Sequence, residues 1–178
     1  MQEDPFREET NPTKKIGSGM TIAAWIFVLA IATLYFDRFL DEQRNPNQEV
    51  EYTEKNNARE VILQRNRQGH YLSSGEINGV KVDFLLDTGA TDVSIPERLA
   101  SALQLKRGPE IEVITANGKI AVNMTTLDRI QIGNIVLYDV RASINPYMDE
   151  DEILLGMTFL KHLEFTQRGE QLILRQYN

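Results

Sequence analysis

The sequence lacks cysteine altogether and has only two histidines, His70 and His162, among its 178 residues. Without cysteine the chain can have no disulfide framework, no thiol nucleophile and no cysteine-ligated metal. Two histidines that are far apart in the sequence also argue against a His-rich metal site. The formal net charge is −7, whereas nucleic-acid-binding proteins usually carry a basic face. We therefore expect no metal centre and no nucleic-acid partner.

Charged residues are also absent from one long stretch, which runs from Ile16 to Phe36. A helix over this stretch would rise roughly 31 Å, about the thickness of a bilayer core. Lys14 and Lys15 precede the stretch, and Asp37 follows it. The pattern predicts a transmembrane helix over residues 16–36, after a polar N-terminal tail over residues 1–15.

Two alternatives compete with a membrane anchor. A buried core helix of this length without charge needs a larger protein around it than this chain provides. A cleaved signal peptide is the other, because Ala30-Ile31-Ala32 fits a small-residue cleavage site. However, the leading segment is long and net acidic, and the apolar run continues past that site. We therefore favour the anchor.

The charges on the two sides of the apolar run bear on its orientation. Lys14 and Lys15 favour a cytoplasmic N-terminus, although Arg38 and Arg44 partly offset them. We expect a single-pass protein of the inner (cell) membrane whose C-terminal domain faces the outer side. In a bacterium this side is the periplasm.

The remainder of the chain divides into a polar stretch and a β-rich stretch. Residues 37–58 are charged and amide-rich, which is typical of a linker. From Arg59 onwards, short alternating apolar runs are separated by turn residues, and this predicts a mostly β domain over residues 59–178. The expected turns are Asn66–Gly69, Asn78-Gly79, Asn117-Gly118, Gly133-Asn134 and Arg168-Gly169. Two short helices are expected, one opening at Pro96-Glu97 and the other over Gly156–Leu163.

The stretch that carries the most chemistry follows an apolar run, Phe84-Leu85-Leu86. Asp87, Thr88 and Gly89 come directly after it, so the aspartate leaves a buried strand at a tight turn that Gly89 permits. A carboxylate in this place is partly desolvated and can be held by nearby backbone and hydroxyl donors. The plain alternative is an Asx turn at a strand end without any catalytic role.

Two further motifs follow this loop in a familiar order: Thr115-Ala116-Asn117-Gly118, and then Leu154-Leu155-Gly156 leading into a short helix. The order of the three motifs resembles that of the retropepsin-like aspartic proteases, and especially their bacterial, membrane-anchored single-lobe members. The resemblance covers the chain from about Arg59 to its end. It implies a single-lobe, closed β barrel with one or two short helices, preceded here by the transmembrane helix.

The resemblance also implies a mechanism. In this family two lobes each contribute one aspartate, and the sequence has no second Asp-Thr-Gly or Asp-Ser-Gly. A working enzyme would therefore be a homodimer with two copies of Asp87, related by a two-fold axis. Two neighbouring carboxylates cannot both ionise cheaply and share one proton, a rule for which the aspartic-protease dyad is itself the standard example. The pair would activate a water for peptide hydrolysis, without a metal or an organic cofactor.

The remaining site residues take supporting roles in the same resemblance. Thr88, Gly89 and Ala90 would support the catalytic loop. Ala116, Asn117 and Gly118 would form the tip of a flap that closes over a protein or peptide substrate bound as an extended strand. Leu154, Leu155 and Gly156 would buttress the catalytic loop.

The leading hypothesis is a membrane-anchored aspartic endopeptidase, and the alternative is a membrane-tethered binding or assembly module that keeps the fold without proteolysis. Other acidic and basic residues receive plainer interpretations. We expect Asp92 to be an ion-pair partner or helix cap, and His70 to lie on a strand outside the site. The acidic run Asp149–Glu152 is expected to be a solvated loop, although it also resembles a metal or regulatory site.

Overall fold

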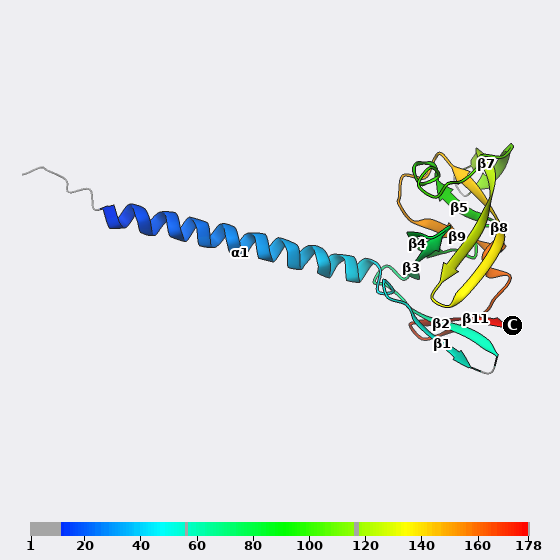
Figure 1. Cartoon of the computed structure of the whole chain (residues 1–178), viewed down its shortest axis with the longest axis horizontal. Coiled ribbons are helices and arrows are strands. Elements are labelled where there is room, and N and C mark those ends of the chain that lie inside the picture. Colours follow the sequence, from blue (N-terminus) through cyan, green and yellow to red (C-terminus); the bar gives the residue numbers. More distant parts are fainter. Residues whose placement is uncertain (1–11, 56, 116–117, 178) are drawn as a thin grey trace, which may run out of the picture. The chain divides into compact units, whose positions relative to one another are not determined.

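The computed structural model describes residues 12–55, 57–115 and 118–177. The chain divides into two compact units, one ending at Leu40 and the other extending from Asp41 to the C-terminus. Helix α1 (Pro12–Arg44) begins in the first unit and ends in the second, and Figure 1 shows it as one continuous helix. Within it, Gly19–Arg44 is long and apolar enough to cross a membrane, and none of its most apolar window is buried against protein.

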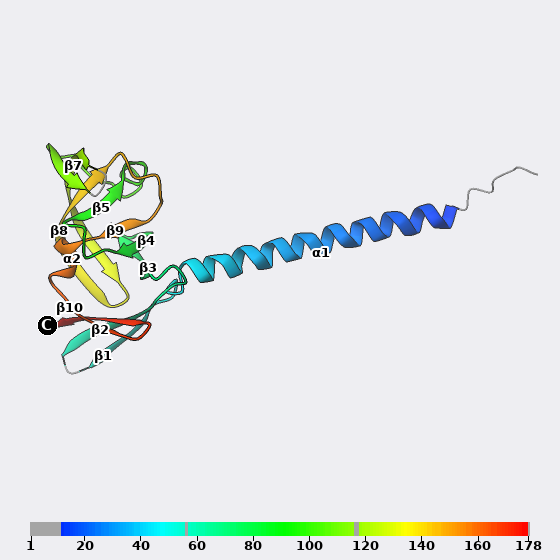
Figure 2. The same ribbon diagram turned by 180° about the vertical axis from the view of Figure 1, so that it is seen from behind.

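The second unit contains a four-stranded antiparallel sheet in the order β1-β2-β11-β10. Its strands are β1 (Glu51–Lys55), β2 (Ala58–Gln64), β10 (Glu164–Arg168) and β11 (Gln171–Tyr177). The sheet therefore joins the beginning of the domain to its end, as the two opposite views in Figures 1 and 2 show. Val61, Leu63 and Leu174 are its fully buried side chains.

Seven further strands form a second sheet in the order β3-β4-β9-β5-β8-β7-β6. They are β3 (Leu72–Ile77), β4 (Val80–Leu86), β5 (Val93–Pro96), β6 (Glu110–Thr115), β7 (Gly118–Ile132), β8 (Ile135–Asn145) and β9 (Ile153–Leu155). Strand β3 also pairs with β7, through Glu76 with Gln131 and Ile77 with Ile130. This pairing closes the sheet, so the predicted closed β barrel is confirmed.

The barrel closure depends on a close approach of two backbones at Gly75. A Cβ atom at this position would lie 2.3 Å from the Gln131 carbonyl oxygen, so only glycine fits there. The core behind the closure consists of aliphatic side chains and two phenylalanines, each of which stabilises the fold by about 1.5–3 kcal/mol when fully buried. Its largest fully buried members are Phe84, Phe159, Leu63, Ile77, Ile95, Leu103, Leu127, Ile130, Ile132, Ile135, Ile144 and Ile153.

Three of the expected hairpins join paired strands as predicted: β3–β4, β7–β8 and β10–β11. Asn78 and Gly79 both have positive φ angles, of 51° and 82°, as a two-residue hairpin turn requires. Strands β6 and β7 also pair, up to Thr115 opposite Gly118. The two short helices are η1 (Glu97–Leu99), which is a single 3₁₀ turn, and α2 (Met157–Leu160).

The expected hairpin at Asn66–Gly69 is wrong. The chain does turn there, because the Asn66 N–H donates to the His70 carbonyl at 2.8 Å, but the flanking strands belong to different sheets. Both edges of β2 are already occupied by β1 and β11, so β2 cannot pair with β3. His70 is likewise not on a strand, contrary to expectation, and lies in the connection before β3.

Residues 37–58, which we expected to be a linker, form regular structure over most of their length. Its first part continues α1 to Arg44, and its last part forms β1 and the start of β2. Asn47 between them is 3% exposed. The Asn47 side chain donates to the Gln64 carbonyl and accepts from the Gln64 N–H at 2.6 Å, and it also donates to the Leu72 carbonyl. The amides of this segment therefore satisfy backbone groups between β2 and β3 and do not merely solvate a tether.

Candidate active site

Asp87 lies at the end of β4, where the backbone is held from both sides. The Leu86 N–H donates to the Tyr71 carbonyl at 3.0 Å, and the Asp87 N–H donates to the Leu155 carbonyl at 3.3 Å. Strand β4 thus stays extended up to Asp87, between the chain entering β3 and the end of β9. This arrangement fixes the position from which the Asp87 side chain projects.

The loop that follows holds the carboxylate itself. The Gly89 N–H donates to Asp87 Oδ1 at 2.8 Å, and the Ala90 N–H donates to the Asp87 carbonyl at 3.2 Å. Asp87 is half-buried, whereas Thr88 and Gly89 are exposed. The turn therefore orients one carboxylate oxygen and presents the loop to solvent, where another molecule can contact it.

Strand β9 packs against this loop and supports it. It pairs in parallel with β4, with Leu154 opposite Leu85 and Leu155 opposite Leu86. Gly156 follows, and a Cβ atom there would lie 2.2 Å from the Asp92 carbonyl oxygen and 2.7 Å from that of Ala90. The backbone of the Asp87 loop therefore packs directly on Gly156. Leu155 and Gly156 thus contact the backbone of the Asp87 loop, and Leu154 pairs with Leu85.

The start of α2 completes the support. The Met157 N–H donates to the Ala90 carbonyl at 2.9 Å, and the Thr158 N–H donates to the Thr91 carbonyl at 3.0 Å. The Thr158 hydroxyl oxygen accepts from the buried Val93 N–H at 3.0 Å. Donors at the beginning of a helix, which have no partner within the helix, thus hold the far half of the loop.

Only part of the predicted flap can be compared with the structure. Ala116 and Asn117 lie outside the described residues. Gly118 begins β7 with a φ of 115°, and its carbonyl accepts from the Thr115 hydroxyl at 2.9 Å. Ile114 on the neighbouring strand β6 is 83% exposed, so the hairpin presents an apolar side chain to solvent near its tip.

Asp92, the second aspartate of the loop, forms an ion pair. Arg141 donates to Asp92 Oδ1 from Nε at 2.9 Å and from Nη2 at 2.8 Å. The Asp92 side chain is only 13% exposed, so the contact ties the loop to β8. This geometry matches the ion-pair interpretation of Asp92.

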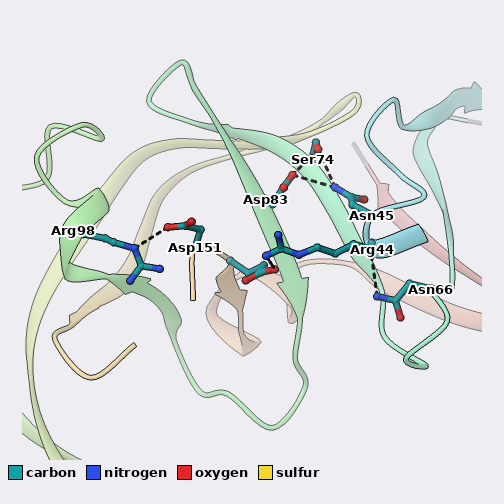
Figure 3. Close-up of polar contacts among 8 residues, drawn as sticks. Arg44, Asn45, Asn66, Ser74, Asp83, Arg98 and Asp151 are labelled. Atoms are coloured by element: carbon teal, nitrogen blue, oxygen red, sulfur yellow. Dashed lines mark hydrogen bonds and ion pairs between the residues drawn. The ribbon is translucent and has the colours of Figure 1, made fainter. Parts of the chain in front are cut away.

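The acidic run 149–152 is solvated as expected at Asp149, Glu150 and Asp151, whereas Glu152 is buried. Asp151 accepts from Arg98 Nε at 2.7 Å, and Arg98 also donates to the Met148 carbonyl at 2.8 Å. Glu152 is buried and pairs with Arg44, the last residue of α1. Figure 3 shows Arg98 bound to Asp151, with Arg44 close to the same loop. No local pattern indicates the Arg44–Glu152 pair, because the two residues are far apart along the chain.

The acidic and imidazole side chains also bear on whether the protein can hold a metal ion. Among residues 12–55, 57–115 and 118–177, no three histidine, aspartate or glutamate side chains are placed to hold a metal ion. The chemical groups that the Asp87 loop offers are a carboxylate, a hydroxyl and backbone N–H groups. These groups can transfer protons and can bind and orient a water molecule.

A closed β barrel with an Asp-Thr-Gly loop braced by a parallel strand and a short helix defines a retropepsin-like aspartic protease fold. Residues 73–162 match the family described as gag-polyprotein putative aspartyl protease, and the chain belongs to this family. The fold is also that of a retropepsin-like aspartic protease from Rickettsia conorii, whose crystal structure superimposes with a TM-score of 0.57 at 30% identity. The match covers 71% of this chain and 96% of that protein.

Two relatives extend the similarity in sequence. An uncharacterized protein of a Sinorhizobium species is 31% identical over 175 residues, which cover 90% of this chain and 75% of the relative. An uncharacterized protein of Rickettsia prowazekii is 26% identical over 121 residues, covering 66% of this chain and 52% of the relative. The first match extends well beyond the protease domain, because it covers nine-tenths of the chain.

Proposed function

We propose that the chain is a membrane-anchored aspartic endopeptidase that hydrolyses peptide bonds as a homodimer. The observation that carries the proposal is the Asp87 loop, whose carboxylate is oriented by the Gly89 N–H at 2.8 Å on a support formed by β9 and α2. The contact from Gly89 alone would also fit a structural Asx turn. What supports catalysis is that this half-buried carboxylate stands on a backbone fixed by β9 and α2, in a chain of the aspartyl protease family.

The proposed reaction uses the Asp87 carboxylates of two subunits. Because like charges at short distance disfavour double ionisation, the pair holds a single proton. The ionised carboxylate removes a proton from a water molecule while that water attacks the scissile carbonyl carbon. The protonated carboxyl gives its proton to the carbonyl oxygen, so a tetrahedral diol forms. The carboxyl that took the proton of the water then gives it to the amide nitrogen as the C–N bond breaks, and the diol returns a proton to the other carboxylate. The products are a carboxylic acid and an amine.

The need for two subunits follows from the sequence and from exposure. No second Asp-Thr-Gly or Asp-Ser-Gly occurs in the chain. Asp139 on β8 is followed by Val140 and so does not provide such a motif. Thr88 and Gly89 are exposed, which leaves the loop accessible to the loop of a second copy. Thr88 would brace the paired loops across the two-fold axis.

The division of the chain fits the same proposal. Residues 16–36 would cross the inner membrane once, after a tail over residues 1–15, and place the protease domain in the periplasm. Confinement to a membrane raises the effective concentration of the subunits and so favours a weak dimer. The domain proposed from residue 59 onwards is extended at its start by the segment from Asp41, which belongs to the same compact unit.

The function is tested by incubating the full chain in lipid nanodiscs with a diverse peptide mixture and identifying new termini by mass spectrometry. Mixing wild-type subunits with an equal amount of Asp87→Asn subunits tests the shared site. When the subunits are mixed before reconstitution and the total amount of protein is kept constant, about one quarter of the dimers keep two Asp87 residues. Activity should then fall to about one quarter of that of the wild type alone, and not to about one half, as it would for independent subunits. A fall to one half would contradict the shared dyad. Absence of cleavage would favour the non-proteolytic binding module.

The membrane anchor makes a separate prediction. The chain should stay in the membrane fraction after extraction with high salt and alkaline carbonate. Replacing Ile26 and Leu29 together by arginine should release it, because each arginine at the centre of a span costs about 2.5–3.5 kcal/mol. Replacing the exposed Tyr138 and Tyr147 of the domain by arginine serves as the matched control and should not release the chain. Extraction of the wild type by carbonate would contradict the anchor.

A further inference from the structure

A hollow of about 440 Å³ is lined in part by Leu85, which lies near the end of β4 and two residues before Asp87. Leu72 and Leu85 provide an apolar wall, and these two residues are paired across strands β3 and β4. The acidic run 149–152 also lines the hollow, together with Arg44, Gln68 and His70, so His70 does not lie outside this site. The hollow therefore combines an apolar surface with a concentration of carboxylates, in a size range that is usual for ligand sites.

The position of Leu85 places the hollow next to the proposed reaction. Leu85 precedes Asp87 by two residues, and alternate residues of an extended strand project from the same face. Their Cα atoms are roughly 7 Å apart, because an extended chain rises about 3.3 Å per residue. A substrate residue adjacent to the scissile bond can therefore reach the hollow with its side chain.

The carboxylates of the acidic run are only partly neutralised. Asp151 is paired with Arg98, and one oxygen of Glu152 is paired with Arg44. Within the described parts of the chain, Asp149 and Glu150 form no ion pair, and both are exposed. The wall of the hollow thus carries a negative charge that its own cations do not balance.

Glu152 supplies an observation that is independent of this charge. The residue is only 8% exposed, and its second carboxylate oxygen, Oε2, is buried without a hydrogen-bond partner among the described residues. Buried polar atoms in proteins nearly always have a partner, so this acceptor is available to a donor that a ligand supplies. Glu152 lines the hollow, and its neighbour Ile153 begins β9.

We propose that the hollow binds the side chain of a lysine or arginine next to the scissile bond of the substrate. The cationic head donates to Glu152 Oε2 and is attracted by Asp149 and Glu150, and the aliphatic stem packs on Leu72 and Leu85. This inference rests on the proposed proteolytic function and names its substrate class. In a homodimer the hollow occurs twice, so a basic residue is accepted on either side of the bond.

A metal ion fits the hollow less well than an organic cation does. No three carboxylate or imidazole groups of the described residues are placed to ligate one ion. The side chains of Leu72 and Leu85 cannot hydrogen-bond the water molecules around a hydrated metal ion, whereas they can pack against the methylene groups of lysine. Arg44 does not compete for the site, because its guanidinium is held on the other oxygen of Glu152.

Binding can be measured without cleavage, with the full Asp87→Asn chain in nanodiscs. Three fluorescent eight-residue peptide mixtures are compared, each with lysine, norleucine or glutamate at one central position and random residues elsewhere. The lysine mixture should bind about tenfold more tightly than the norleucine mixture. The reason is that only lysine can form charge-assisted hydrogen bonds with the carboxylates of the hollow, and these bonds are strong enough to account for such a ratio of affinities. The glutamate mixture should bind most weakly.

Two variants then locate the preference. Asp149→Asn with Glu150→Gln changes exposed side chains that support no described contact, so folding should be unaffected, and the lysine preference should fall at least about threefold. Glu152→Gln should abolish the preference, but this variant also disturbs a buried pair, so its melting temperature is measured in parallel. Asp128→Asn with Asp139→Asn removes the same charge elsewhere and should leave the preference unchanged.

The outcomes separate this inference from the proposed function. Equal binding of the lysine and norleucine mixtures, no binding of any mixture, or a preference that persists in both hollow variants would overturn the basic-residue assignment. Cleavage of peptides by the wild type without enrichment of lysine or arginine would also overturn it and leave the protease proposal intact. Preferential binding of lysine by a wild type that cleaves nothing would support the hollow and overturn the protease proposal.

Discussion

Replacing Asp87 by asparagine is expected to reduce peptide cleavage by at least about 10³-fold, since it removes both proposed proton-transfer groups of the dimer at once. The amide has nearly the shape of the carboxylate, and its oxygen can still accept from the Gly89 N–H, which lies 2.8 Å from Asp87 Oδ1. The melting temperature and the dimer fraction should therefore stay close to those of the wild type. Initial rates on a peptide that the wild type cleaves measure the loss.

The matched control is Asp139→Asn, which makes the same chemical change at an exposed position on β8. Its backbone has a φ of 52°, a conformation that asparagine tolerates as well as aspartate does, so neither stability nor rate should change. Undiminished cleavage by the Asp87→Asn chain would exclude Asp87 as the catalytic group. A loss that came with unfolding would instead assign Asp87 a structural role.

The second large effect is expected for Gly156→Ala, and it comes from a lack of space. Gly156 has a φ of −86°, which any residue can adopt, so the backbone itself does not need glycine. A Cβ atom would nevertheless lie 2.2 Å from the Asp92 carbonyl oxygen and 2.7 Å from that of Ala90. Because both obstacles are backbone atoms, the Asp87 loop must move. We expect a loss of at least about 3 kcal/mol in the free energy of unfolding and no detectable cleavage.

Gly79→Ala provides the contrast. Gly79 has a φ of 82°, but a Cβ atom there would meet nothing within 4 Å. The substitution should therefore cost only backbone strain, about 1–2 kcal/mol, and leave cleavage by the surviving folded protein unchanged. Urea unfolding of both variants provides the comparison. If Gly156→Ala were no more destabilising than Gly79→Ala, the Asp87 loop would not depend on its close packing against Gly156.

The features that the sequence predicted well are those that short stretches determine. The turn at Asn78-Gly79 needs two adjacent residues with positive φ angles, and asparagine followed by glycine is the pair of residue types that predicts such a turn. The Asp87 loop could be predicted for a similar reason, because an apolar strand, an aspartate and a glycine occur in direct succession. The order of three such local motifs was enough to predict the family and the closed barrel.

Features that join distant segments could not be predicted in this way. Nothing local in Asn66–Gly69 distinguishes a hairpin from a turn between two sheets, since the outcome depends on β1 and β11 having already occupied both edges of β2. Likewise, Asn47 is one amide among several in a polar stretch. Its burial depends on Gln64 and Leu72, which are distant in the sequence and whose backbone carbonyls accept from its side chain.

The same reasoning applies to charges. Glu152 stands in a run of four acids, a pattern that usually indicates solvation. Its burial depends on Arg44, which is remote in the sequence and comes at the end of an apolar helix. Ion pairs of this kind carry no periodic signal. They are therefore found only when the fold has brought their partners together.

The three hydrogen bonds of the Asn47 side chain have a consequence for how the domain could be released in soluble form. A cut after Asn47 would strip β2 of its edge partner β1 or leave the backbone groups of Gln64 and Leu72 without their buried amide. The usual site for shedding a tethered domain, a polar stretch just beyond the apolar helix, is therefore part of the folded unit in this protein. A soluble form that keeps every described contact of the domain must begin at or before Asp41, within the helix itself.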